Sequence, residues 1–419
     1  KQMRSKIPQI SPESLKKWKD ILLELREDAQ KLEELSAGVL EYSLEDQQSH
    51  EWSDWLQRPL IQIQGQLDEI EELNHTLHPE KTTILPKVGA ALLTNKRRML
   101  TEPSSFDNNI MGWVPDGEIN PEFLYYVACR VDMEAFAQKG AVPSISKSIA
   151  KSFKFPLPPL PEQRKIASVL YNVDEAIRKT EEIIEGTKRV KMGVMQEVFT
   201  TGAFNHEDTK EVRLGPIKTT IPEEWDTVKM TENFEIIDGD RGKNYPSSSD
   251  FSEDGYCLFL SAENVTSEGL QFDETEFIDK DKDESLRKGK VERNDIIMTT
   301  RGTVGNIGLY DDEAPYEHVR INSGMVILRP DNEVIPQFYY HLFSSPVFQK
   351  QISNVTYGTA QPQTSVTDIE RMRIFDISKE EQEAIADMLE NMDERIDLEM
   401  ETKERLRRVK RALMQDLLT

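Results

Sequence analysis

Three glycine-containing segments in the second half of the chain, 238–248, 299–306 and 357–365, combine basic and amide side chains with small residues. Arginine can donate two hydrogen bonds to a guanine edge and glutamine can pair with adenine, while lysine, serine and backbone amides bind phosphates. Glycine lets the backbone approach a duplex closely. The side chains that could make such contacts are Arg241, Lys243, Tyr245, Arg301, Thr303, Gln361 and Gln363. The alternative is that these segments are ordinary surface turns.

The first half of the chain contains counterparts of these segments. They read PKVG at 86–89, TNKRRM at 94–99, FDNN at 106–109 and GAVPSISKS at 140–148. Their recurrence in both halves, with the shortage of Asp and Glu in 357–365, supports a binding role as well as it supports ordinary surface turns.

We find no set of residues that predicts catalysis. The sequence contains neither a P-loop nor the Asn-Pro-Pro-aromatic tetrad of amino-methyltransferases. The glycines of 301–308 are three residues apart, but no helix pattern follows them, which favours a turn between strands over a nucleotide cradle. His75 and His78 lack a third ligand nearby, so a solvated pair is favoured over a metal site. We expect a chain that is not an enzyme and holds no metal or cofactor.

The charge balance restricts how such a chain could bind DNA. The net charge is −24 over 419 residues, whereas affinity for DNA comes largely from phosphate neutralisation by Lys and Arg. A binder this acidic must concentrate its basic residues locally, rely on a basic partner, or work at high salt. The alternative explanation of the acidity is solubility charge on helix faces.

The cellular setting follows from two further features. Cys129 and Cys257 are the only cysteines, too few for a disulfide framework, which fits a reducing cytoplasm. The start of the chain has no apolar signal region and no long apolar run occurs, so we expect no membrane span and a cytoplasmic location.

An internal repeat organises the chain. Residues 190–200 (VKMGVMQEVFT) and 409–419 (VKRALMQDLLT) are identical at five positions. At the same offset, Glu162-Gln163 corresponds to Glu381-Gln382. Two segments of about 40 residues are therefore copies of each other.

Each copy has the pattern of a long helix. Apolar residues recur at spacings of three and four, with charges between them. Pro161 favours a helix start in the first copy, and Ser378 three residues before Glu381 predicts a capping box in the second. One apolar stripe on each helix must pack on something, most simply on the other helix. The stripe residues on which we rely are Leu170, Ile177, Ile184, Leu389, Ile396 and Leu406.

The remaining segments differ in pattern. Short apolar runs punctuated by Gly, Asn, Asp and Pro predict a β-rich domain at 203–379, and residues 81–155 resemble its later half, with 82–89 aligning to 295–302. Two apolar stripes before residue 80 predict a helical hairpin. The expected fold class is α+β, with β-rich domains separated by two long antiparallel coiled-coil helices and an extra N-terminal helical hairpin. The expected boundaries are 1–80, 81–161, 162–202, 203–379 and 380–419.

The motifs together resemble a known family. PLPPLPEQRKIASVL, VDEAI and KMGVMQEVFTTG resemble the conserved helix of type I restriction–modification specificity subunits. IIDGDRGKNYPSS, FLSAENVT, TTRGTVGNIG and GTAQPQTS resemble the target-recognition domain of that family. The resemblance covers about 81–419, and only the later half of a first target-recognition domain is expected at 81–161.

The resemblance implies a role for every segment. Two target-recognition domains each read half of a split DNA sequence, and two antiparallel helices act as a spacer between them. Methyltransferase subunits bind the spacer and use S-adenosylmethionine, and motor-nuclease subunits use ATP and Mg²⁺. The residues of the three glycine-containing segments are then DNA contacts, and the stripe residues belong to the partner-binding helices. The competing interpretation is a coiled-coil assembly scaffold, such as a truncated or decoy specificity subunit, without full DNA reading.

Overall fold

The computed structural model describes residues 77–138, 142–357 and 362–418. The predicted hairpin at 1–80 lies almost entirely outside these residues and stays a prediction. The chain divides into two compact units, of which the larger comprises Pro79–Glu102 and Phe106–Thr419. In the described part of the smaller unit, His78 and Ser104 form an isolated antiparallel bridge. Everything below concerns the larger unit.

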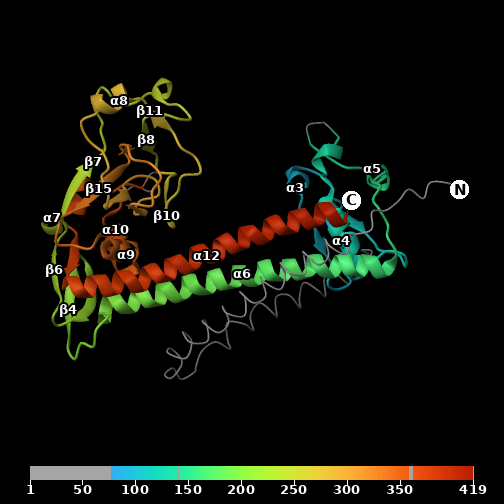
Figure 1. The fold of residues 1–419 in the computed structure, drawn as a ribbon, viewed down its shortest axis with the longest axis horizontal. Helices are drawn as coiled ribbons and strands as arrows, with labels where there is room; N and C mark the ends of the chain where they lie inside the picture. Colours follow the sequence, from blue (N-terminus) through green and yellow to red (C-terminus); the bar gives the residue numbers. More distant parts are fainter. Residues whose placement is uncertain (1–76, 139–141, 358–361, 419) are drawn as a thin grey trace. The chain divides into compact units, whose positions relative to one another are not determined.

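Two long helices run side by side through this unit, as Figure 1 shows. They are α6 (Leu160–Thr201) and α12 (Lys379–Leu417). Ion pairs between them join early residues of one helix to late residues of the other: Asp174–Lys410, Glu181–Arg407 and Lys191–Asp393. The predicted antiparallel helix pair is confirmed.

The helix starts follow the sequence signals only in part. Pro161 lies in the first turn of α6, where its missing N–H costs no hydrogen bond. At α12, Ser378 Oγ accepts from the N–H of Glu381 at 3.3 Å, as predicted. The second half of the capping box does not form, because the Glu381 carboxylate accepts instead from Trp225 Nε1 at 2.8 Å and from the N–H of Ala203 at 2.9 Å. A buried indole and a free backbone donor compete successfully for this carboxylate.

A small domain precedes α6. Its antiparallel sheet has the order β2-β1-β3, and its core contains Leu85, Leu92, Met133 and Ile145. Its elements are β1 (Thr83–Pro86), α3 (Ala90–Leu93), β2 (Arg98–Met99), β3 (Ile110–Trp113), α4 (Pro121–Arg130), the 3-10 turn Glu134–Phe136 and α5 (Lys147–Lys151).

A larger domain lies between the two helices in sequence, and its main sheets have the orders β13-β12-β15-β7 and β11-β8-β14. The four-stranded sheet is antiparallel, whereas β14 pairs with β8 in parallel. Its strands are β4 (Thr209–Leu214), β5 (Ile217–Pro222), β6 (Asp226–Lys229), β7 (Phe234–Asp238), β8 (Cys257–Leu260), β9 (Val265–Thr266), β10 (Gly269–Leu270), β11 (Phe277–Ile278), β12 (Asp295–Thr299), β13 (Ile307–Tyr310), β14 (Val319–Ile321), β15 (Met325–Pro330) and β16 (Arg373–Asp376).

Short helices complete this domain. They are α7 (Met230–Asn233), the 3-10 turn Ser248–Asp250, α8 (Lys280–Ser285), α9 (Pro336–Ser344), α10 (Pro346–Val355) and α11 (Val366–Glu370). One apolar core joins the four-stranded sheet and α9 to both long helices, for example through the edge-to-face contact of Phe199 and Phe338. The domain is therefore packed on the helix pair rather than tethered to it. The predicted α+β class is confirmed.

Both domains attach to the helices in the same way, which gives the sequence repeat a structural meaning. Gln163 accepts from the N–H of Asn120, which precedes α4, at 2.7 Å and donates to the Pro158 carbonyl at 2.8 Å. The corresponding Gln382 accepts from Ile335, which precedes α9, at 2.8 Å and donates to the Ile377 carbonyl at 3.0 Å. The repeated Glu-Gln pair thus carries a glutamine that fixes each domain to its helix.

Within the described ranges, no helix is long and apolar enough to cross a membrane.

Candidate nucleic-acid interface

Two of the three predicted segments lie side by side. Arg301 and Gln363 form an antiparallel bridge, the Gly302 N–H donates to the Pro362 carbonyl at 3.1 Å, and the Thr364 N–H donates to the Thr300 carbonyl at 2.9 Å. Gly302 has a φ of 74°, a left-handed conformation that glycine adopts without strain. Gln361 lies outside the described residues, so its placement stays a prediction.

The third segment joins this group through a turn that the sequence analysis missed, residues 322–324. Arg241 Nη2 donates to the Ser323 carbonyl at 3.2 Å, and the Ser323 N–H donates to the Tyr245 hydroxyl at 3.5 Å. On the other side, the Thr300 N–H donates to the Gly324 carbonyl at 2.7 Å. This Asn-Ser-Gly turn between β14 and β15 has a recognisable turn composition, but its position between the loops could be seen only in the folded chain.

Most exposed polar side chains of this group are cationic or hydroxylic, and Asn244 adds an amide. Arg241, Lys243, Arg301 and Thr303 are exposed, and Gln363 is half-buried. Donors therefore gather on one set of joined loops, which is the composition that phosphates and base edges require.

Tyr245 has a different environment from the one we expected for a DNA contact. Its ring packs edge-on against Phe259 at 5.8 Å and belongs to a small cluster with Cys257, Ile278 and Leu286. The ring of Tyr245 is thus engaged in packing. The described structure gives Tyr245 a part in holding the loop, and its contact with DNA remains a prediction.

A buried carboxylate anchors the loop that carries Arg241 and Lys243. Asp240 is 5% exposed and accepts from the N–H groups of Gly242 and Arg287. Burial acts to raise the pKa of Asp240, but the two backbone donors and the Arg287 charge outweigh it, so the pKa lies below its ordinary value. Asp240 is therefore held as an anion that fixes the loop from inside.

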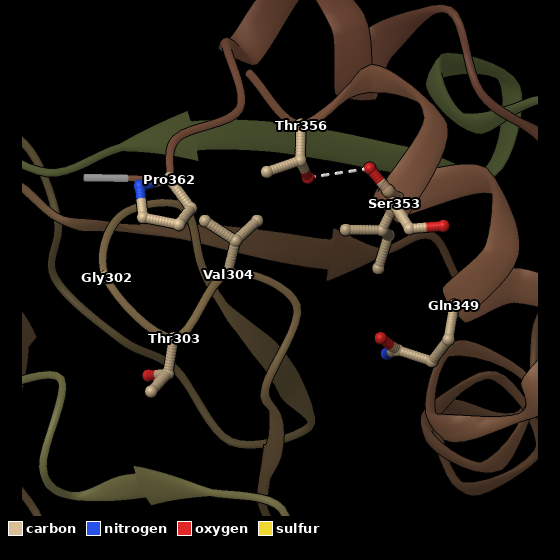
Figure 2. Close-up of a pocket in the computed structure, with 8 residues that line it drawn as sticks. Gly302, Thr303, Val304, Gln349, Ser353, Thr356 and Pro362 are labelled. Carbon is tan, nitrogen blue, oxygen red and sulfur yellow. Dashed lines mark hydrogen bonds between the residues drawn. The ribbon is translucent and has the colours of Figure 1, made fainter. Parts of the chain in front are cut away.

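An open hollow of about 420 Å³ adjoins the loops (Figure 2). Thr303 and Val304 line it from the turn between β12 and β13, whereas Gln349 and Thr356 line it from α10 and its C-terminal end. Gln349 Nε2 donates to the Gly305 carbonyl at 2.8 Å, so α10 braces the turn that carries Arg301 and Thr303.

The small domain contains the same loop arrangement with other side chains. Val88 and Ser144 form the bridge that Arg301 and Gln363 form in the larger domain. Gly89, with a φ of 76°, donates to the Pro143 carbonyl at 2.8 Å, as Gly302 does to Pro362. The backbone of the loop pair is therefore repeated, while its arginine and glutamine are replaced by valine and serine.

One basic residue of the small domain is structural. Arg97 is 3% exposed and donates to the carbonyls of Ala128 and Val131, each at 3.1 Å. Its guanidinium thus ties the segment before β2 to the end of α4. The segment 94–99 carries less free positive charge than its sequence suggests.

The stripe residues of the long helices are largely inaccessible. Ile177 is partly buried, and the others, Leu170, Ile184, Leu389, Ile396 and Leu406, are buried. Their side chains therefore do not form an open surface for a partner. They could act on a partner by shaping the helix pair, and this role stays a prediction.

Known proteins share sequence similarity with this chain. Residues 53–188 and 222–408 match the family described as type I restriction modification DNA specificity domain. The specificity subunit of type I restriction enzyme MjaVIII from Methanocaldococcus jannaschii is 30% identical over 285 residues, which are 66% of this chain and 64% of that protein. The chain thus spans slightly under two thirds of that relative's length. The EcoBI specificity subunit of Escherichia coli is 26% identical over 292 residues, 67% of this chain and 60% of that protein.

A solved structure shares the fold. The type I restriction–modification S subunit from M. genitalium has a TM-score of 0.51 at 16% identity, over 82% of this chain and 84% of that one. At this identity the likeness concerns the fold alone. The family match covers most of the sequence, including most of each long helix and both loop groups. The chain therefore belongs to the family of type I restriction modification DNA specificity domains.

Proposed function

We propose that this chain reads a split DNA target and acts as the specificity subunit of a type I restriction–modification complex. The observation that carries the proposal is the joining of three separate glycine-containing segments, by backbone and side-chain hydrogen bonds, into one group of exposed Arg, Lys and Thr side chains. The repeated loop backbone in the small domain supports a second contact with the duplex. Family membership and relatives named as specificity subunits support the same role.

The chemistry of modification would belong to other subunits. Methyltransferase subunits would bind the helix pair and bring S-adenosylmethionine, and motor-nuclease subunits would bring ATP and Mg²⁺. Such a complex acts on genomic DNA, which supports a cytoplasmic location. The free thiols of Cys129 and Cys257 support the same location, because the cytoplasm keeps thiols reduced.

The test is sequence-selective binding and modification. The full chain, assembled with methyltransferase subunits, should select one split motif from a library of randomised duplexes and direct methylation to it. The chain alone should transfer no methyl group from S-adenosylmethionine. Methyl transfer by the isolated chain would exclude a purely recognition role.

A second candidate is a scaffold that lacks full DNA reading. It is favoured by the small domain, where Val88 and Ser144 replace Arg301 and Gln363. In that case the assembled complex would bind target and scrambled duplexes equally well.

A further inference from the structure

The guanidinium of Arg241 is held by one of its three nitrogens. Nη2 donates to Asp238 Oδ1 at 3.1 Å and to the Ser323 carbonyl at 3.2 Å. Nε and Nη1 have no protein partner among the described residues. Because the side chain is 47% exposed, these two nitrogens remain open to a ligand.

The backbone beneath this side chain has little freedom. A side chain at Gly239 would place its Cβ 2.1 Å from the carbonyl oxygen of Asn322, so the loop lies directly against the 322–324 turn. The buried Asp240 carboxylate accepts hydrogen bonds from the N–H groups of Gly242 and Arg287, and this fixes the backbone on both sides of Arg241. The guanidinium is thus the movable part of Arg241, and among the described residues Asp238 is the only side chain that bonds to it.

A neighbouring carboxylate changes what an arginine recognises. It compensates the positive charge, so the attraction for a phosphate, which depends mainly on charge, becomes weaker. It also orients the remaining N–H groups, so directional hydrogen bonds to a base edge lose less side-chain entropy when they form. With both Nη2 bonds in place, the approach to a base is through Nη1 or Nε.

We propose that Asp238 is a positioning residue for DNA specificity, which orients the Arg241 guanidinium toward a base edge and suppresses its binding to phosphate. This inference rests on the proposed function of the chain. Asp238 ends β7, where its backbone pairs with Val326. Within the described ranges, its carboxylate bonds only to Arg241. Its side chain can therefore be changed while the strand keeps its pairing.

Two substitutions separate charge from orientation. Asp238→Asn keeps an oxygen acceptor but removes the charge, whereas Asp238→Ala removes both. Glu207→Gln is the matched control, because Glu207 is an exposed carboxylate before β4 and lies outside the joined loops. Arg241→Ala and the double variant Arg241→Ala/Asp238→Ala complete the set.

Each variant is assembled as the full chain with methyltransferase subunits and assayed on a randomised duplex library, then on a selected and a scrambled duplex across a salt series. Arg241→Ala should lower the preference at one base pair about tenfold or more, and Asp238→Ala should lower it at the same base pair by about threefold or more. Both Asp238 variants should bind the scrambled duplex more tightly, with a salt dependence steeper by about one unit.

The outcomes distinguish this inference from the proposed function. A parent complex without any base preference contradicts the proposed function. A selective parent whose Asp238 variants behave like Glu207→Gln overturns the inference alone. The same holds if the Asp238→Ala effect persists when Arg241 is already alanine, because a positioning residue has no effect without the side chain that it positions.

Discussion

Arg241 and Lys243 lie two residues apart in one loop, but their charges have different surroundings. Arg241 is hydrogen-bonded to Asp238 and to Ser323, whereas Lys243 is exposed and its ammonium has no partner among the described residues. An ammonium on a flexible stem binds phosphate as a point charge, whereas a guanidinium held in one orientation donates directional hydrogen bonds. The same loop therefore offers one candidate for reading a base and one for phosphate attachment.

Lys243→Ala should weaken binding to all duplexes by a similar factor and reduce the salt dependence by about one unit, because one phosphate contact is lost. The measurement is affinity of the assembled complex for target and scrambled duplexes across a salt series. Lys218→Ala is the control, since that ammonium pairs with Glu211 on the β4–β5 hairpin. A loss confined to the target duplex would show that Lys243 reads sequence instead.

At the scale of elements, the long helices depend on a few fully buried side chains. Leu170 is 0% exposed on α6, and its counterpart in the repeat, Leu389, is 0% exposed on α12. The adjacent Tyr171 is 55% exposed. The same substitution at Leu170 and at Tyr171 therefore separates the effect of burial from the effect of helix propensity.

Leu170→Asp should lower the melting temperature and weaken binding of methyltransferase subunits, because an unpaired buried charge costs several kcal/mol. Tyr171→Asp places the same side chain on the exposed face and should change stability little. Thermal melting and partner affinity measure the two effects. If Leu170→Asp matches Tyr171→Asp in both, the helix pair does not depend on this contact.

At the scale of the whole chain, one joint between the larger domain and the helices is ionic. His206 Nε2 lies 2.9 Å from Glu381 on α12, and Nδ1 lies 2.9 Å from Glu224 in the turn between β5 and β6. Only an imidazolium can donate to both carboxylates. Its hydrogen bond to Glu381, followed by the other carboxylate interactions, raises the pKa of His206 above its ordinary value of 6.5 despite burial.

This joint should make stability depend on pH. A raised folded-state pKa contributes stability that is fully present below about pH 6.5 and is lost as pH rises through the folded-state pKa. The melting temperature of the parent should therefore exceed that of His206→Gln most at about pH 6 and converge toward it at about pH 9. A difference that stays constant with pH would mean that the imidazolium charge does not hold the joint. The nearby Lys210 ammonium bonds to the Glu223 carbonyl and to Asp226.

Local patterns were sufficient to predict the two long helices, their antiparallel pairing, the α+β class and the glycine-containing loops. Apolar spacing, proline position and capping residues act within a few turns of the chain, so they can be read without the fold. The internal repeat also related residues that are far apart in the sequence, because two copies of one sequence form equivalent contacts. The equivalent hydrogen bonds of Gln163 and Gln382 and the matching φ values of Gly89 and Gly302 are its physical expression.

Contacts between residues distant in sequence were decided only by the tertiary structure. Arg241 and Ser323 are 82 positions apart, and Trp225 and Glu381 are 156 apart. No local propensity indicates that Glu381 leaves its capping box for an indole, or that the ring of Tyr245 packs on Phe259 instead of remaining free. Each choice depends on which donors and apolar surfaces are buried together after folding, because burial sets the cost of leaving a polar group unpaired.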